Sequence, residues 1–261
     1  MTLYLHELRR GRLPLIIWSA VISFLIGVCV LIYPEMQAQM GDMGMIFESM
    51  GTLTDAFGMS EINFSEFIGY FATEFSNTVL LGGSLFAAII ASGALSSEEG
   101  DGTAEFLLTH PVSRSKILLA KLLSIITRIL ILNLAICAVV VACMLAVSES
   151  ADAKIMFLMF LSGAIMEIEI ACICFMASSF MKRGGMAVGI GISMMLYFLN
   201  IVSNIAEEAE FLKYVTPFAY SDSAKILTDG EINLPYLICG AVILAASVAV
   251  AFIGYNKKDI S

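Results

Sequence analysis

The sequence predicts an all-α integral membrane protein with six transmembrane helices. Of its 261 residues, 59% are hydrophobic and only 14% are charged, whereas a soluble domain is about half apolar and about a quarter charged. Six apolar runs are long enough to cross a bilayer, which takes about 20 residues, and basic residues gather in alternate connections between these runs. A soluble fold of this composition would leave much apolar surface in water, so we expect one transmembrane domain over residues 1–261.

The first expected span covers residues 14–33. Pro14 suits the first turn of a helix, and Pro34 follows the last apolar residue of the run. The preceding segment, residues 3–10, is amphipathic and basic, which predicts a short helix at the cytoplasmic interface. The other five expected spans are residues 70–95, 117–147, 155–181, 186–205 and 234–255. The longer ones must tilt or extend beyond the membrane.

Basic residues set the predicted orientation. With the N-terminus inside, the cytoplasmic segments hold ten lysines and arginines, at positions 9, 10, 12, 114, 116, 121, 182, 183, 257 and 258. The external segments hold only Lys154, Lys213 and Lys225. The positive-inside rule therefore predicts that both termini are cytoplasmic.

Two further features concern the spans and the last external connection. The six cysteines all fall inside apolar runs, so we expect neither a disulfide framework nor a metal site. The external segment Glu207–Glu231 carries Phe211, Tyr214, Phe218 and Tyr220. This density of aromatic residues predicts interfacial or re-entrant half-helices, which are tolerated at membrane depth only when protein shields them.

The most informative stretch is the connection between the second and third spans. Gly100 and Gly102 break the incoming helix, and Thr103 can start a short new helix that Pro111 ends. Phe106, Leu107 and Leu108 would give this helix an apolar face on the cytoplasmic side, where no lipid covers it. The pattern indicates a docking element for a soluble partner; an ordinary cytoplasmic connection is the alternative.

The same stretch resembles the signature of ABC-2 type transporter permeases, the six-span membrane subunits of ABC exporters. The matching residues are Glu98, Gly102, Thr103, Glu105, Leu107, Leu108, Pro111, Val112, Ser113, Arg114, Lys121, Leu122 and Leu123. The resemblance implies that Gly102–Thr109 is a coupling helix seated in a cleft of an ATP-binding subunit. The docking residues it implies are Glu98, Gly102, Thr103, Glu105, Phe106, Leu107, Leu108, Pro111 and Arg114.

The resemblance also implies partners. The chain has no Gly-x-x-x-x-Gly-Lys-Ser/Thr phosphate loop, so ATP and Mg²⁺ are expected on a separate ATPase, and no cofactor is expected in this chain. Six spans form half of the usual exporter, which implies a second permease, identical or not, in a prokaryotic cell membrane. The lipid bilayer is a further expected partner and nucleic acid is not.

Three ionisable residues fall inside the expected spans: Arg128, Glu167 and Glu169. Arg128 lies about eleven residues into the third span from the cytoplasm, and Glu169 lies about eleven residues before the cytoplasmic end of the fourth. An isolated charge in the bilayer costs at least about 3 kcal/mol, so we expect an Arg128–Glu169 ion pair, with Glu167 turned roughly 160° away around its helix. These groups are either structural or part of a passage for cargo or ions.

The function that these features predict is an ATP-driven export permease without catalytic residues of its own. Its substrate stays open among antimicrobial peptides, drugs, lipids and ions. The alternative is a non-transporting sensor or immunity subunit that uses the same fold. An intramembrane protease is disfavoured because the two histidines, His6 and His110, fall in cytoplasmic segments. A self-powered secondary transporter is disfavoured because no internal repeat is visible.

Overall fold

The computed structural model describes residues 2–49, 66–100, 113–181 and 184–257. These residues are almost entirely helical and contain no strand. The helices, in chain order, are α1 (Thr2–Arg10), α2 (Arg12–Ser49), α4 (Phe67–Glu74), the π-helix η1 (Phe75–Leu80), α5 (Leu81–Gly100), α7 (Arg114–Val147), α8 (Ala153–Phe180), α9 (Gly185–Ile205), the 3-10 helix η2 (Glu207–Tyr214), α10 (Ser223–Asp229) and α11 (Leu234–Lys257).

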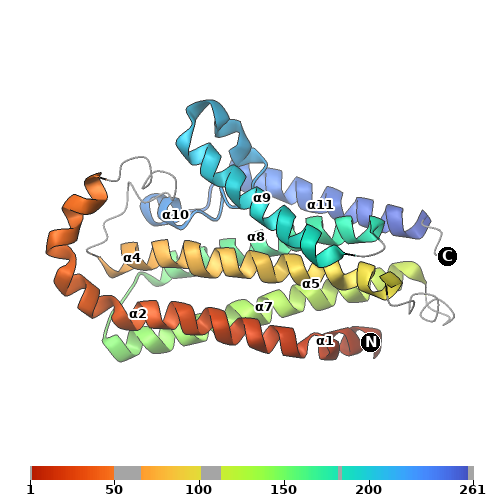
Figure 1. The fold of residues 1–261 in the computed structure, drawn as a ribbon, viewed down its shortest axis with the longest axis horizontal. Coiled ribbons are helices and arrows are strands. Elements are labelled where there is room, and N and C mark those ends of the chain that lie inside the picture. The colour runs from red at the N-terminus through yellow and green to blue at the C-terminus, as the bar shows by residue number, and fades with distance from the viewer. Residues whose placement is uncertain (1, 50–65, 101–112, 182–183, 258–261) are drawn as a thin grey trace.

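Among the described residues, six helices are long and apolar enough to cross a membrane, which confirms the predicted number of spans. They cover Arg12–Gln37, Phe67–Ser96, Arg114–Val147, Ala153–Phe180, Gly185–Ile205 and Leu234–Lys257. The beginning of α1 and the end of α11 lie at the same end of the bundle (Figure 1), as an even number of spans requires. We call this end of the bundle the terminal end.

The bundle is built around two long helical segments (Figure 1). One is α8, and the other is the continuous helix formed by α4, η1 and α5, which packs along α8. About 61% of the apolar stretch of α8 and 56% of that of Phe67–Ser96 are buried, against 17% for α11. The helices α2 and α7 pack together on one side of this centre, and α9 and α11 lie on the other. The central helices therefore hold the protein core.

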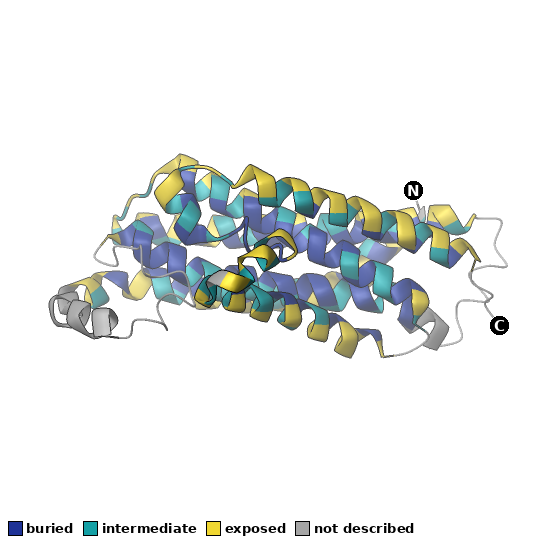
Figure 2. Ribbon diagram, turned by 90° about the horizontal axis from the view of Figure 1, so that it is seen from above, coloured by how far each residue is buried: buried dark blue, intermediate teal, exposed yellow. Residues whose placement is uncertain are grey.

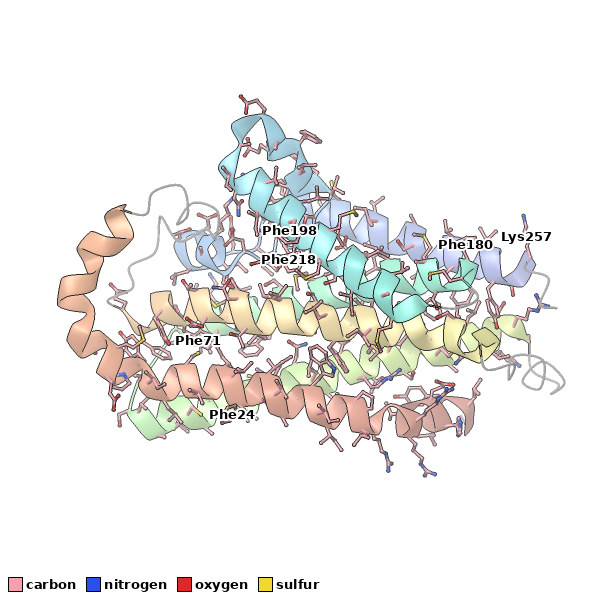
Figure 3. The ribbon with its side chains drawn as sticks, viewed as in Figure 1. Phe24, Phe71, Phe180, Phe198, Phe218 and Lys257 are labelled. Atoms are coloured by element: carbon pink, nitrogen blue, oxygen red, sulfur yellow. The ribbon has the colours of Figure 1, made fainter. Side chains whose placement is uncertain are left out.

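The outer helices have one buried and one exposed face (Figure 2). Phe71 and Phe218 are buried, whereas Phe24 of α2 and Phe198 of α9 are 69% and 56% exposed (Figure 3). Large apolar side chains on the outside of a helix bundle suit contact with lipid tails or with another membrane subunit.

The close packing of α9 against α5 depends on small residues. Gly185 and Gly189 lie four residues apart, on one face of α9. A Cβ at either glycine would collide with α5, at the backbone carbonyl of Ser92 for Gly185 and that of Ala88 for Gly189. This small-xxx-small arrangement lets two membrane helices approach until their backbones touch.

The first transmembrane helix extends beyond its expected span, residues 14–33. The helix α2 continues through Pro34 to Ser49, and its C-terminal part turns away from the direction of its beginning (Figure 1). Proline removes one backbone hydrogen bond and crowds the preceding turn, so it bends a helix without always ending it.

The segment between α9 and α11 folds back onto the bundle. Phe218 and Tyr220 are only 4% and 2% exposed, while Phe211 and Tyr214 of η2 are largely exposed. The helix α10 packs against α4, and the Ser76 hydroxyl donates a 2.9 Å hydrogen bond to Ser223. One half of the aromatic segment thus joins the core, and the other half stays on the outside.

Candidate functional site

Polar side chains form a layer halfway along the central helices. Glu167 of α8 lies 14 residues after Ala153 and 13 residues before Phe180, so it sits near the midpoint of its helix. The neighbouring helices α5, α7 and α9 contribute further polar residues at a similar height, among them Ser84 and Ser193, whose hydroxyls are 3.0 Å apart. We call this set, together with Glu169 and its partners, the polar layer.

Glu167 is enclosed by α5 and α7. Its side chain has no exposed surface, and its Oε2 accepts a 2.7 Å hydrogen bond from the Asn133 amide. The carboxyl group lies directly against Gly83, where any Cβ would overlap it. Its second oxygen, Oε1, and the Asn133 Oδ1 have no partner among the described residues. Buried polar atoms without partners are rare and costly, and they are enriched at functional sites.

Glu169 faces the other side of α8. Its Oε2 accepts a 2.7 Å hydrogen bond from the Tyr220 hydroxyl and lies against Gly240 of α11. Its Oε1 also lacks a partner within the described part of the chain. Burial, and secondly the neighbouring Glu169, raise the pKa of the Tyr220 hydroxyl, so the phenol keeps its proton and remains a donor.

A small polar cavity opens at the opposite end from the termini, between η1, α9 and the returning segment. Its volume is about 40 Å³ and its polar lining residues include Ser76, Asn77, Asn200 and Asp222, which is enough room for a water molecule. Asp222 caps α10 by accepting hydrogen bonds from backbone amides, and burial raises the pKa of its carboxyl group. The π-helix η1 contributes to this lining; such insertions are frequent at functional sites.

Arg128 is not part of the polar layer, and the predicted Arg128–Glu169 ion pair is wrong. The Arg128 Nε donates to the Ser124 carbonyl at 3.2 Å and Nη2 to the Ser124 hydroxyl at 3.3 Å, both on its own helix. Helical side chains lean toward the N-terminus of their helix. Since α7 and α8 are antiparallel, Arg128 leans toward the terminal end and Glu169 leans away from it.

A second charged cluster lies at the terminal end. The Lys121 Nζ is 3.0 Å from the Glu7 Oε1, and both side chains are nearly buried. The Tyr4 hydroxyl is also 3.0 Å from the Thr127 hydroxyl. These contacts hold α1 along α7; the predicted location of α1 at the membrane interface stays a prediction.

The predicted docking residues Gly102, Thr103, Glu105, Phe106, Leu107, Leu108 and Pro111 lie outside the described residues. Glu98 belongs to the last turn of α5. Arg114 begins α7, where its Nη1 donates to the Tyr255 carbonyl of α11 at 3.3 Å. The structure thus describes the two ends of the predicted coupling segment, and the docking role stays a prediction.

Sequence reasoning selected Glu167 and Glu169 but missed their partners. Asn133 is a polar residue inside an apolar run, which is itself a signal of an intramembrane site. No comparable signal marks Gly83 and Gly240, because their role depends on which helices touch. Tyr220 stood out only as one aromatic residue among several in its segment.

Comparison with known proteins gives one family. A family model described as "ABC-2 family transporter protein" matches residues 1–260. No curated protein matches the chain. The match covers almost the whole chain and agrees with its six membrane-spanning helices, so the chain belongs to the ABC-2 family of transporter proteins.

Proposed function

We propose that this chain is the membrane-spanning subunit of an ATP-driven exporter, powered by a separate ATP-binding subunit. The observation that carries the proposal is the family match over residues 1–260. The absence of a phosphate-loop motif from the sequence supports a separate ATPase. A second permease, identical or related, completes the pathway, and the exposed apolar faces of α2, α9 and α11 leave room for such a contact.

The terminal end faces the cytoplasm in this proposal. Arg9, Arg10, Arg114, Lys116 and Lys257 all belong to helix ends at the terminal end. The opposite end of the bundle carries Lys154, Lys213 and Lys225. The excess of basic residues at the terminal end supports this orientation.

The coupling segment, residues 102–109, transmits the ATPase movement to the polar layer. It connects α5 to α7, and these two helices carry Gly83 and Asn133, which enclose Glu167. The helices α5 and α7 move as rigid rods between the terminal end and the polar layer. A displacement at the terminal end therefore changes the packing of α5 and α7 against α8. Polar contacts at mid-membrane then reform in a second arrangement, which opens an outward route between the two permeases.

Co-purification with a co-expressed ATP-binding cassette subunit from the same genome tests the docking assignment. Glu105→Lys and Leu108→Asp are expected to abolish co-purification from detergent extracts, because they change the charge and the apolar surface of the docking helix. Glu208→Lys is the matched control, since Glu208 is an exposed acid outside that segment. Retention of the ATPase by both docking variants would refute the assignment.

Reconstituted liposomes test transport. ATP hydrolysis by the complex is expected to rise when the exported compound is present, and the compound should move away from the ATPase side. If ATP hydrolysis responds to the compound without any movement of it, the chain is a sensor or immunity subunit. Activity of the purified chain with no ATPase present, or residues 102–109 on the external side, would overturn the proposal.

A further inference from the structure

A cavity lies at the terminal end between α1, the beginning of α2, α5 and α7. Its volume is about 240 Å³, and the charged residues that line it are Glu7, Arg10, Lys121 and Arg128. Arg10 is exposed, whereas Glu7, Lys121 and Arg128 are buried, so the cavity has a mouth at the surface and a charged floor. We call it the basic cavity, because three bases and one acid give its lining a net charge of +2.

The floor of the basic cavity holds a cation, Arg128, on which the Glu7 carboxylate acts electrostatically without forming an ion pair with it. Glu7, the acid of the lining, bonds to Lys121 at 3.0 Å. Arg128 is 8% exposed and donates only to the carbonyl and hydroxyl of Ser124, one turn earlier in α7. Within the described residues it forms no ion pair. A guanidinium has five N–H donors, so Arg128 keeps donors available toward the cavity.

The backbone makes room for this guanidinium. Gly11 lies at the junction of α1 and α2, and a Cβ there would overlap the Arg128 Nη1 and come within 2.9 Å of its Cζ. On the α5 side, a Cβ built at Gly93 meets nothing within 4 Å. Gly11 thus makes room for the guanidinium, and the open space beside Gly93 leaves room for an anion bound to Arg128.

The length of α7 puts Arg128 at the height expected for lipid headgroups when Val147 is taken as the other end of the membrane span. The helix α7 has 34 residues, about 51 Å at helical rise, whereas the hydrocarbon core is about 30 Å thick and needs about 20 residues. Counting 20 residues back from Val147, the other end of α7, reaches Arg128. The contact with Gly11, one residue before α2 begins, gives the same height from a second helix.

We propose that the basic cavity binds the phosphate of an anionic phospholipid from the leaflet that faces the chain termini. Arg128 binds the phosphate through two parallel N–H donors, the geometry for which guanidinium is suited. Arg10 at the mouth adds positive charge, and Pro14 and Ile90 of the lining contact the upper acyl chain. The net positive lining favours an anionic headgroup over a zwitterionic one.

Native mass spectrometry of the purified chain in uncharged detergent tests this site. The chain is titrated with phosphatidylglycerol or with phosphatidylcholine of the same acyl chains, and in a third arm with inorganic phosphate as competitor. Wild type is expected to bind one phosphatidylglycerol more tightly than phosphatidylcholine. Arg128→Gln is expected to weaken phosphatidylglycerol binding about tenfold, the effect of losing one charge-assisted hydrogen-bond pair.

Two further variants make the test specific. Lys116→Gln removes the same charge from an exposed position at the beginning of α7, and its affinity should equal that of wild type. Gly11→Ala keeps every charge but displaces the guanidinium, and it should weaken binding as Arg128→Gln does; it carries the test if Arg128→Gln does not fold. Equal affinity for both lipids, or unchanged binding in the Arg128 and Gly11 variants, would overturn the proposal. Displacement of the lipid by millimolar phosphate would assign the site to free phosphate instead.

Discussion

Asn133 and Glu167 are expected to be coupled energetically through their hydrogen bond. A double-mutant cycle measures this coupling energy. Asn133→Leu removes the 2.7 Å bond and leaves Glu167 with no partner on either oxygen. An unsatisfied buried polar group costs about 1–3 kcal/mol, so this variant should lower the free energy of unfolding by that amount. Glu167→Leu should cost less, because the Asn133 amide keeps its 3.1 Å bond to the Ile129 carbonyl.

The double variant is expected to be more stable than the sum of the single effects predicts. It removes both polar groups and leaves apolar side chains in their place, so no buried donor or acceptor loses its partner. Polar pairs between membrane helices show coupling energies of about 0.6 kcal/mol, with a maximum of about 1.7 kcal/mol. We expect a value in the upper half of this range because both side chains are buried.

The free energies of unfolding of wild type, the two single variants and the double variant are measured by equilibrium unfolding in mixed dodecyl maltoside and SDS micelles, followed by far-UV circular dichroism. Asn200→Leu is the matched control: it makes the same substitution at a partly buried position of α9 whose side chain forms no hydrogen bond with any described residue, and it should be close to neutral. A double variant whose loss equals the sum of the two single losses would show that this bond does not couple α7 to α8.

Three other predictions concern the remaining polar contacts. Gly240→Ala should destabilise the protein by about 1–3 kcal/mol because the new methyl overlaps the Glu169–Tyr220 pair, whereas Gly191→Ala, with nothing within 4 Å, should be neutral or stabilising in the same unfolding assay. Because the pKa of Tyr220 is raised in the folded protein, the protonated phenol contributes stability at pH values below the ordinary tyrosine pKa of 10.0, and this contribution is lost as the pH rises above 10.0. The free energy of unfolding should therefore differ more between pH 8 and pH 11 in wild type than in Tyr220→Phe. Glu7→Gln should lower the thermal unfolding temperature in detergent because it removes the carboxylate that bonds the buried Lys121 at 3.0 Å. The double variant with Lys121→Gln should recover part of this loss.

The spans could be predicted from the sequence because hydropathy is a local property. Each of the six apolar runs must satisfy its backbone hydrogen bonds within itself in a bilayer, and the helix does so independently of its neighbours. The apolar run 14–33 predicts only the part of the first helix that crosses the membrane, and α2 itself continues to Ser49. A proline weakens a helix locally, but the residues around it decide whether the chain continues as a helix.

Side-chain pairing could not be predicted in the same way. The height of Arg128 along its helix suggested Glu169 as a partner, yet Arg128 leans toward Gly11 and Glu169 toward Tyr220 and Gly240. Height in the membrane is one coordinate of three. The rotation of each helix about its axis, and the direction in which its side chains lean, fix the other two.

The sequence by itself determined the class of this protein, its six spans and the positions of its intramembrane acids. It did so because hydrophobicity and charge act on each segment separately. The tertiary structure alone decided that Asn133 and Gly83 enclose Glu167, that Tyr220 returns from the end of the bundle to bond Glu169, and that Gly11 makes room for Arg128. These contacts join residues far apart in the chain, and they exist only once the helices have packed with one rotation and one depth relative to each other.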